Sequence, residues 1–248
     1  MERSYWEKIA PQYNEEIFDV LANDRQSLIR AAVLEAADPG KTVLDAGCAI
    51  GKWLPVLAPV FGKVIAADIS AANLDIAREH HPQFSNIHYL RTDLSSAKRK
   101  LPRCEVVLCV NAILTGKMIG RTHFIHNLRR CLVKGGRLIL VVPSLESWLL
   151  TRTIQQHHGI DKALFAKRPA PAEGARRYQL IQQGVVEIDD KPTKHYLKEE
   201  LEFWLTRNGF SVLRARKIEY PWKTEFVRPP RWLKQPQPWD WMVVAEKI

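Results

Sequence analysis

The chain has 248 residues and a formal net charge of +10, with 46% hydrophobic and 26% charged residues. These proportions are ordinary for a soluble globular protein, and the length suits one α/β domain with an additional segment. No apolar run approaches the ~18 residues that a transmembrane helix needs, which argues against a membrane-spanning protein.

The cysteines and the charges favour a cytoplasmic protein with a solvated basic surface. Residues 1–6 lack the apolar region of a signal peptide. The 37 basic residues are scattered and no run reaches five, which favours plain solubility over a nucleic-acid-binding stripe, although nucleic acid or an acidic substrate remains an alternative partner. Four cysteines show no Cys-x-x-Cys spacing and are expected to be reduced structural thiols: Cys48, Cys104, Cys109 and Cys131.

The first elements along the chain are helical. Residues 4–37 predict a helix whose apolar face recurs at helical spacing, and the turn 38–40 ends it. Three aromatic residues, Tyr5, Trp6 and Tyr13, precede the most regular part of this pattern. They are expected either to pack on the sheet or to cover a ligand.

Residues 42–53 predict a strand, a glycine turn and the start of a helix over 51–60. Such a turn forms a ligand cradle, because backbone N–H groups point outward and the missing side chains allow close approach. Gly47 and Gly51 stand four residues apart, which differs from the Gly-x-Gly-x-x-Gly of dinucleotide sites. Asp45 stands just before the first glycine, where its carboxylate would repel a pyrophosphate and suit ammonium and sulfonium charges.

Two further carboxylates follow the next strands. Asp68 ends a strand over 63–70 and lies 21 residues after Gly47, the spacing of an acidic residue that binds ribose hydroxyls. Asp93 follows a strand over 87–94. Because ligands bind beyond the carboxyl ends of parallel strands, we expect Asp45, Asp68 and Asp93 to line one crevice. One carboxylate each for an amino group, a ribose and an adenine amine describes S-adenosylmethionine.

The remaining elements continue the α/β alternation until residue 144, where a long segment interrupts it. The segment 167–177 is expected to be a basic loop, since it is rich in Ala, Pro and Gly. The expected elements, in chain order, are a helix at 71–81, a strand at 105–111, a helix at 118–132, a strand at 137–142, helices at 145–157 and 198–207, and strands at 210–218 and 239–246.

The sequence resembles the class I S-adenosylmethionine-dependent methyltransferases, especially their small-molecule members. The resemblance is strongest over residues 43–51, continues at Asp68, Asp93 and the glycine turn in 132–140, and covers about 1–145 and the last fifty residues. Ala49 replaces the family's usual middle glycine, and an alanine fits there when its φ is negative. The resemblance implies a single α/β domain over 1–248: a Rossmann-like, doubly wound seven-stranded sheet with the last strand antiparallel and an insertion after strand five.

The resemblance also implies roles for particular segments and residues. Residues 1–40 would form an N-terminal helical lid, and 144–196 an insertion that covers the substrate. The residues implied to bind S-adenosylmethionine are Tyr13, Asp45, Ala46, Gly47, Cys48, Gly51, Asp68, Ile69, Thr92, Asp93, Leu94, Val110 and Asn111.

Methyl transfer from a sulfonium is an in-line displacement, so the protein chiefly positions the acceptor and excludes water. A base is needed only when the acceptor must lose a proton. Among His123, His126, Tyr178, His195 and Tyr196, we favour His195 and His126 for that role. No metal is expected, because no carboxylates follow strand four, and the sequence after Asn111 lacks the Pro-Pro-aromatic turn of enzymes that methylate nucleobase amines.

The preferred interpretation is therefore a methyltransferase that acts on a small molecule. The alternatives are an RNA or protein methyltransferase, a non-catalytic S-adenosylmethionine-binding protein, and a nicotinamide-dependent oxidoreductase, which Asp45 and the glycine spacing disfavour. The acceptor atom and the oligomeric state are left open by the sequence.

Overall fold

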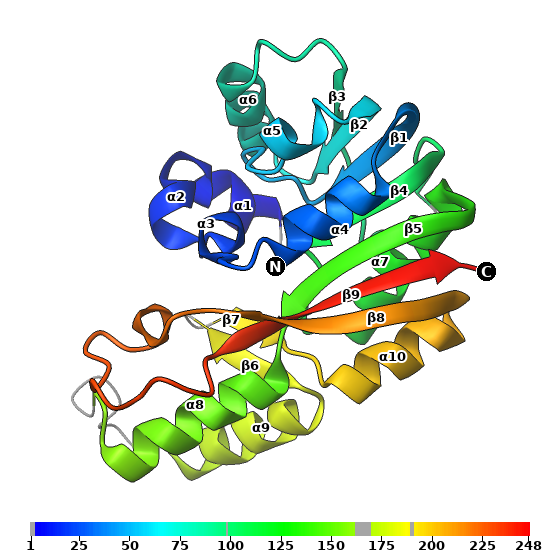
Figure 1. Ribbon diagram of the computed structural model, residues 1–248. Coiled ribbons are helices and arrows are strands. Elements are labelled where there is room, and N and C mark those ends of the chain that lie inside the picture. Colours follow the sequence, from blue (N-terminus) through cyan, green and yellow to red (C-terminus); the bar gives the residue numbers. More distant parts are fainter. Residues whose placement is uncertain (1–2, 98, 162–169, 189–190) are drawn as a thin grey trace.

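A seven-stranded sheet forms the centre of the computed structural model, which describes residues 3–97, 99–161, 170–188 and 191–248 (Figure 1). The strand order is β3-β2-β1-β4-β5-β9-β8, and β9 runs antiparallel to both of its neighbours while all other pairs are parallel. This confirms the predicted Rossmann-like sheet. The strands are β1 Asp38–Ala46, β2 Phe61–Asp68, β3 Ile87–Arg91, β4 Cys104–Val110, β5 Leu132–Pro143, β8 Phe210–Glu219 and β9 Trp239–Lys247.

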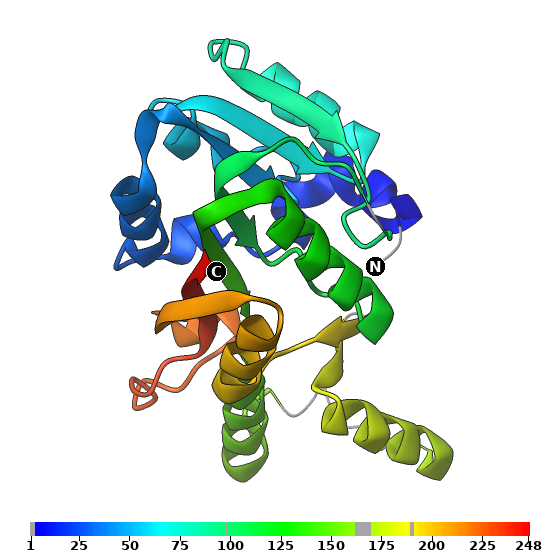
Figure 2. The same cartoon turned by 90° about the vertical axis from the view of Figure 1, so that its right-hand side faces the viewer.

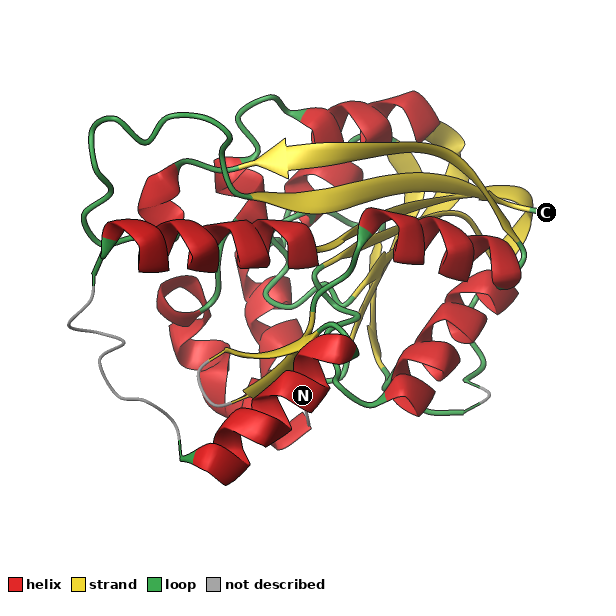
Figure 3. Ribbon diagram, turned by 90° about the horizontal axis from the view of Figure 1, so that it is seen from below, coloured by secondary structure: helices red, strands yellow, loops and turns green. Residues whose placement is uncertain are grey.

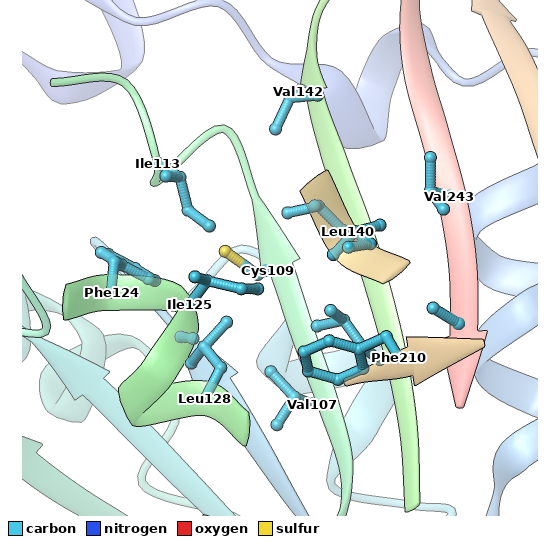
Figure 4. Packing of buried hydrophobic residues seen from close by; sticks show 14 of the residues in the cluster. Val107, Cys109, Ile113, Phe124, Ile125, Leu128, Leu140, Val142, Phe210 and Val243 are labelled. Carbon is cyan, nitrogen blue, oxygen red and sulfur yellow. The ribbon is translucent and has the colours of Figure 1, made fainter. Parts of the chain in front are cut away.

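Helices cover both faces of the sheet, so alternate residues of each central strand enter two separate cores. One core lies under α4 (Leu28–Ala36), α5 (Leu54–Leu57) and α6 (Ala71–His80), and the other under α7 (Met118–Cys131) and α10 (Lys198–Arg207). Figure 4 shows part of the second core, where Phe124, Ile125 and Leu128 of α7 face Val107 and Cys109 of β4. The helix expected over 51–60 is confined to α5, because Pro55 lies in its first turn and Pro59 follows it.

The N-terminal segment is a chain of short helices and not the continuous helix expected over 4–37. Asp19 accepts a hydrogen bond from Ala22 N–H at 2.9 Å and starts one helix, while Asp24 accepts from the N–H groups of Leu28 and Ile29 and starts α4. Side-chain capping of this kind divides a helical pattern into separate turns. The short helices are α1 Arg3–Ile9, η1 Ala10–Gln12, α2 Tyr13–Glu16 and α3 Val20–Asn23.

Glu7 fastens this segment to the body of the protein. Its carboxylate accepts hydrogen bonds from the N–H groups of Ala71 and Ala72, at 3.0 and 3.1 Å, and from the Ser70 hydroxyl at 3.1 Å. These groups form the first turn of α6, whose N–H groups have no partners within the helix. The backbone hydrogen bonds lower the pKa of Glu7. Figure 1 shows α1–α3 beside the carboxyl ends of the strands.

The segment after β5 contains a helix α8 (Leu145–His158), a helix α9 (Pro171–Gln182) and a hairpin of β6 (Val185–Ile188) and β7 (Lys191–Lys194). The expectation of a loop over 167–177 is therefore wrong from Pro171 onward, while 167–169 lie outside the described residues. Pro171 fits the first helical turn, and Glu173 pairs with Arg176 and Arg177 three and four residues later. Figure 2 shows α9 projecting from the body, and α9 has no buried residue.

All four cysteines are buried and free, as expected of structural thiols. Across the described ranges, no helix combines the length and the apolar character needed to cross a membrane.

Candidate active site

A cavity of about 550 Å³ opens where the parallel strands end. The ends of β1, β2, β4 and β5 form its floor, and three other segments line it: the N-terminal helices, the β6–β7 hairpin and the connection from β8 to β9. Figure 3 shows the hairpin next to the N-terminus, and Lys191 Nζ lies 5.8 Å from the centroid of the Tyr5 ring. A cavity of this size and position is where ligands of open α/β sheets bind.

The loop after β1 depends on two glycines for different reasons. Gly47 lines the cavity with φ +83°, and a Cβ there would lie 2.5 Å from Ala112 Cβ. Gly51 also has φ +83°, but a Cβ there would lie 2.7 Å from Leu54 Cδ1, so this glycine allows the loop to pack on the neighbouring helices. Gly51 and Ala46 are not among the residues that line the cavity.

Ala49 adopts φ +47°, so the condition under which an alanine fits this position easily, a negative φ, is not met. A left-handed conformation costs an alanine roughly 1–2 kcal/mol. Its N–H donates a hydrogen bond to Asp68 Oδ2 at 3.0 Å, which helps to hold the loop in this form. An alanine in a left-handed conformation therefore stands where the family usually has a glycine.

Asp45 is buried at the end of β1 with an incomplete set of partners. Its side chain is 2% exposed, and Asp45 Oδ2 has no hydrogen-bond partner in the described part of the chain. Burial, together with the nearby charge of Asp68, raises the pKa of Asp45 to about 7. A cation bound beside this carboxyl would supply the missing interaction.

Asp68 and Asp93 accept more hydrogen bonds than Asp45 does. Asp68 accepts hydrogen bonds from the N–H groups of Ala49 and Ser70, yet its burial still raises its pKa. Burial also acts to raise the pKa of Asp93, but hydrogen bonds from Ser95 and Ser96 outweigh it, and the pKa is lowered. Both side chains line the cavity, together with Cys48, Ile69, Thr92, Leu94, Val110 and Asn111.

Tyr13 lines the cavity from the N-terminal helices. Its ring centroid lies 5.7 Å from Lys52 Nζ, and Lys52 in turn forms a 2.7 Å ion pair with Asp19. Burial, followed by the charge of Asp68, raises the pKa of the Tyr13 hydroxyl. This phenol therefore stays protonated and can donate a hydrogen bond to a ligand.

The two histidines favoured as bases lie in different places. His195 follows β7, lines the cavity and is 8% exposed, and burial lowers its pKa to about 4. His126 is on the outer surface of α7, where it lines a separate depression, so its predicted role is wrong. Helical spacing put His126 on the same face as His123, and that face turns away from the strand ends.

The other proton-transfer candidates also lie elsewhere. His123 shares the outer depression, Tyr178 is 64% exposed on α9, and Tyr196 is buried with its hydroxyl donating to the Ile113 carbonyl at 2.9 Å. None of the three lines the cavity.

A buried carboxyl on the other side of the cavity was not predicted from the sequence. Asp240, at the start of β9, accepts hydrogen bonds from Asn111 Nδ2 and from the Tyr220 hydroxyl, both at 3.0 Å. Burial raises its pKa. The sequence feature that could have indicated Asp240 is its position as a single carboxylate between Trp239 and Trp241, in a strand that is otherwise apolar up to residue 245.

Comparison with known proteins identifies the family. A model described as a methyltransferase domain matches residues 21–215, which is most of the chain. The chain belongs to this methyltransferase family. With the sheet order described above, it is a class I methyltransferase, whose methyl donor is S-adenosylmethionine. No curated protein matches the sequence significantly.

Solved structures share the fold over nearly the whole chain. A complex of DhpI with SAM and HEP is 17% identical, with a TM-score of 0.62 over 98% of this chain and 94% of that one. Magnesium protoporphyrin IX methyltransferase from Synechocystis PCC 6803 with bound SAH is 16% identical, with a TM-score of 0.63 over 99% and 98%. A Haloferax volcanii methyltransferase solved with the activator Trm112 is 15% identical, with a TM-score of 0.61 over 98% and 97%.

The residues at the strand ends fit this donor. Asp45 offers a carboxyl that lacks a partner on one oxygen, Asp68 and Asp93 retain acceptor capacity, and Gly47 leaves room for close approach. When bound, S-adenosylmethionine supplies a methyl group on a sulfonium, which leaves as a neutral thioether. The chain must then hold the donor, orient the acceptor and exclude water.

Proposed function

We propose that this methyltransferase acts on a small-molecule acceptor. The observation that carries the proposal is one cavity at the strand ends, which the N-terminal helices, the hairpin and the connection between β8 and β9 also line. Asp93 follows β3, and Asp68 and Asp45 lie in the last two residues of β2 and β1; these strands are neighbours in the sheet at a spacing of about 4.8 Å. This row would hold the adenine, the ribose and the amino group in turn. The methyl group would then point toward β4 and β5.

The other end of the cavity is lined from several sides. Ile17 and Phe18 reach it from the N-terminal segment, Thr193 from the hairpin, His195 from just after it, and Thr224 from the connection between β8 and β9. Residues 1–40 and 144–196 are therefore proposed to act as covers over the acceptor, mainly through the hairpin and the start of α8. Closure of these segments over a bound acceptor would suit a small molecule and would keep water from the donor.

His195 is proposed to orient the acceptor. Its low pKa keeps the imidazole neutral at physiological pH, and Nδ1 lies 3.3 Å from the Thr193 carbonyl oxygen. Donation from Nδ1 to that oxygen would leave Nε2 as a hydrogen-bond acceptor. An imidazole with this pKa is a weak base, so hydrogen bonding is its better-supported role.

An RNA or protein substrate is the second candidate. The net charge of +10 favours it. The cavity argues for the first candidate, because Lys52 is the one Lys or Arg among the described residues that line it, and Asp19 already neutralises Lys52.

Two measurements test the proposal. Isothermal titration should detect S-adenosylhomocysteine and not NAD, since the loop lacks a dinucleotide fingerprint. S-adenosylmethionine labelled in its methyl group, incubated with the low-mass and the macromolecular fractions of a cell extract, should transfer label to low-mass products. Label found only in RNA or protein would overturn the small-molecule assignment while leaving the family intact.

A further inference from the structure

The acceptor end of the cavity is acidic although the whole protein is basic. Asp240 and Glu225 both line it, and no Lys or Arg in the described residues bonds to Asp240. Asp240 is 8% exposed, and no hydrogen bond to its Oδ1 is found within the described ranges. Arg152, whose guanidinium lies 5.4 Å from the Trp148 ring centroid, partly offsets the charge of Glu225.

Aromatic rings stand beside these carboxylates. The Tyr220 hydroxyl donates to Asp240 at 3.0 Å, and the edge-on Phe18 ring lies 4.7 Å from the Tyr220 ring, measured between centroids. Both rings line the cavity. Carboxylates next to aromatic faces favour an organic cation, since the ring quadrupole and the negative charge both attract it. They disfavour a carboxylate or phosphate ligand.

These residues belong to the acceptor end and not to the donor row. Asp240 is on β9, three strand positions from β1 in the sheet and thus about 14 Å away. Asp45, at the end of β1, is in the row proposed for the donor's own ammonium group. A second ammonium site at Asp240 would therefore serve the other substrate.

We propose that the acceptor is an organic amine, bound as its ammonium form between Asp240, Glu225 and the rings of Phe18 and Tyr220, and methylated on nitrogen. This inference rests on the proposed small-molecule function. An ammonium has no lone pair, so it first gives one proton to Asp240 or Glu225. The amine lone pair then forms the N–C bond as the C–S bond breaks, and the sulfur keeps that electron pair. The products are an N-methylammonium and neutral S-adenosylhomocysteine, and the carboxyl that took up the proton then releases it to water.

Tetramethylammonium tests the cation site without requiring any particular acceptor skeleton. Titrated into the complex with S-adenosylhomocysteine, it should bind saturably, as measured by calorimetry, whereas sodium chloride at equal ionic strength should not. Asp240→Asn combined with Glu225→Gln should weaken this binding at least about tenfold, because the cation then loses both carboxylates and keeps only the aromatic rings. Asn at 240 can still accept the two hydrogen bonds.

Control variants show whether a loss of tetramethylammonium binding is specific to the proposed cation site. Glu219→Gln removes a carboxylate that neighbours Tyr220 in the chain but does not line the cavity, so it should leave tetramethylammonium binding unchanged. S-adenosylhomocysteine affinity monitors folding of every variant. Glu225→Gln alone serves if substitution of the buried Asp240 prevents folding.

The amine assignment and the small-molecule function can fail separately. Absence of saturable tetramethylammonium binding, or equal binding by the double variant, would overturn the amine assignment. A labelled low-mass product that is a methyl ester or ether would do the same while leaving the small-molecule function standing. Label confined to RNA or protein would instead overturn that function.

Discussion

At the residue scale, Asp45 affects both the stability of the folded protein and the binding of the ligand. Its pKa of about 7 in the folded protein exceeds the 3.8 of an ordinary Asp, so the folded state holds a proton that the unfolded state releases between these values. The contribution of this carboxyl to stability is complete below pH 3.8 and is lost as the pH rises through about 7. Above that pH the buried charge destabilises the protein in the absence of a ligand.

Replacing Asp45 by Asn should therefore stabilise the ligand-free protein at alkaline pH. We expect Asp45→Asn to raise the free energy of unfolding by a few kcal/mol at about pH 8 and to change it little at about pH 4. Thermal unfolding at both pH values measures this. The same variant should lose most of its S-adenosylhomocysteine affinity, because the ligand's ammonium loses its partner. A variant that is destabilised at alkaline pH would contradict the assigned electrostatics.

The strand-end carboxylates were predictable because each follows a local apolar run in the sequence. Asp45, Asp68 and Asp93 needed only the rule that parallel strands end at one edge. Asp240 was not predictable in this way, because its place beside Asn111 depends on β9 inserting between β5 and β8. The left-handed φ of Ala49 was also hidden, since tertiary contacts impose it on a residue that disfavours it.

At the scale of elements, the N-terminal helices line the cavity, and α1 is joined to the body of the protein mainly at its surface. Helix α1 has no buried residue, and Glu7 is its hydrogen-bonded link to α6. Trp6 and Tyr13 line the cavity from this segment, and their ring centroids lie 6.5 Å apart. Removing the link should loosen the cover without disturbing the sheet.

Glu7→Ala should thus make the first helices more accessible to protease and weaken S-adenosylhomocysteine binding. Helix-capping interactions are worth about 0.5–2 kcal/mol, and the solvent exposure of Glu7 reduces this, so we expect affinity to fall by up to about fivefold. Limited proteolysis and calorimetry measure the two effects. Glu15→Ala, in the same segment but without a capping contact in the described residues, is the matched control. Equal behaviour of the two variants would show that Glu7 does not hold the cover.

Helices and strands were predictable from the sequence where burial imposes a hydrophobic period. The short N-terminal helices and helix α9 were not. The strands, α6, α7 and α10 match their expected ranges to within a few residues at most of their ends. Helix α9 was missed because composition suggested a loop, whereas Glu173, Arg176 and Arg177 stabilise the helix through pairs on an exposed surface. Such pairs leave no apolar pattern to detect.

At the scale of the whole molecule, the charges are distributed unevenly. The chain has a net charge of +10, whereas carboxylates outnumber basic side chains among the described residues that line the cavity. Several basic residues are already paired, among them Arg176 with Glu187 and Arg214 with Glu35. A basic exterior attracts polyanions weakly and without selectivity, while the acidic interior repels phosphate. Surface charge and catalytic specificity are therefore expected to be independent.

This separation predicts weak, salt-dependent binding of RNA at a place other than the cavity. The dissociation constant should be roughly 10⁻⁴–10⁻⁶ M near physiological salt and should rise steeply with added salt, as counterion release requires. Fluorescence anisotropy with labelled single-stranded RNAs of two unrelated sequences measures both the affinity and its salt dependence. The two RNAs should bind alike, and saturating S-adenosylhomocysteine should change neither value, since its site is inside the cavity. Nanomolar binding that distinguishes the sequences, or that the cofactor product strengthens, would instead make RNA the substrate and give the basic surface a role in catalysis.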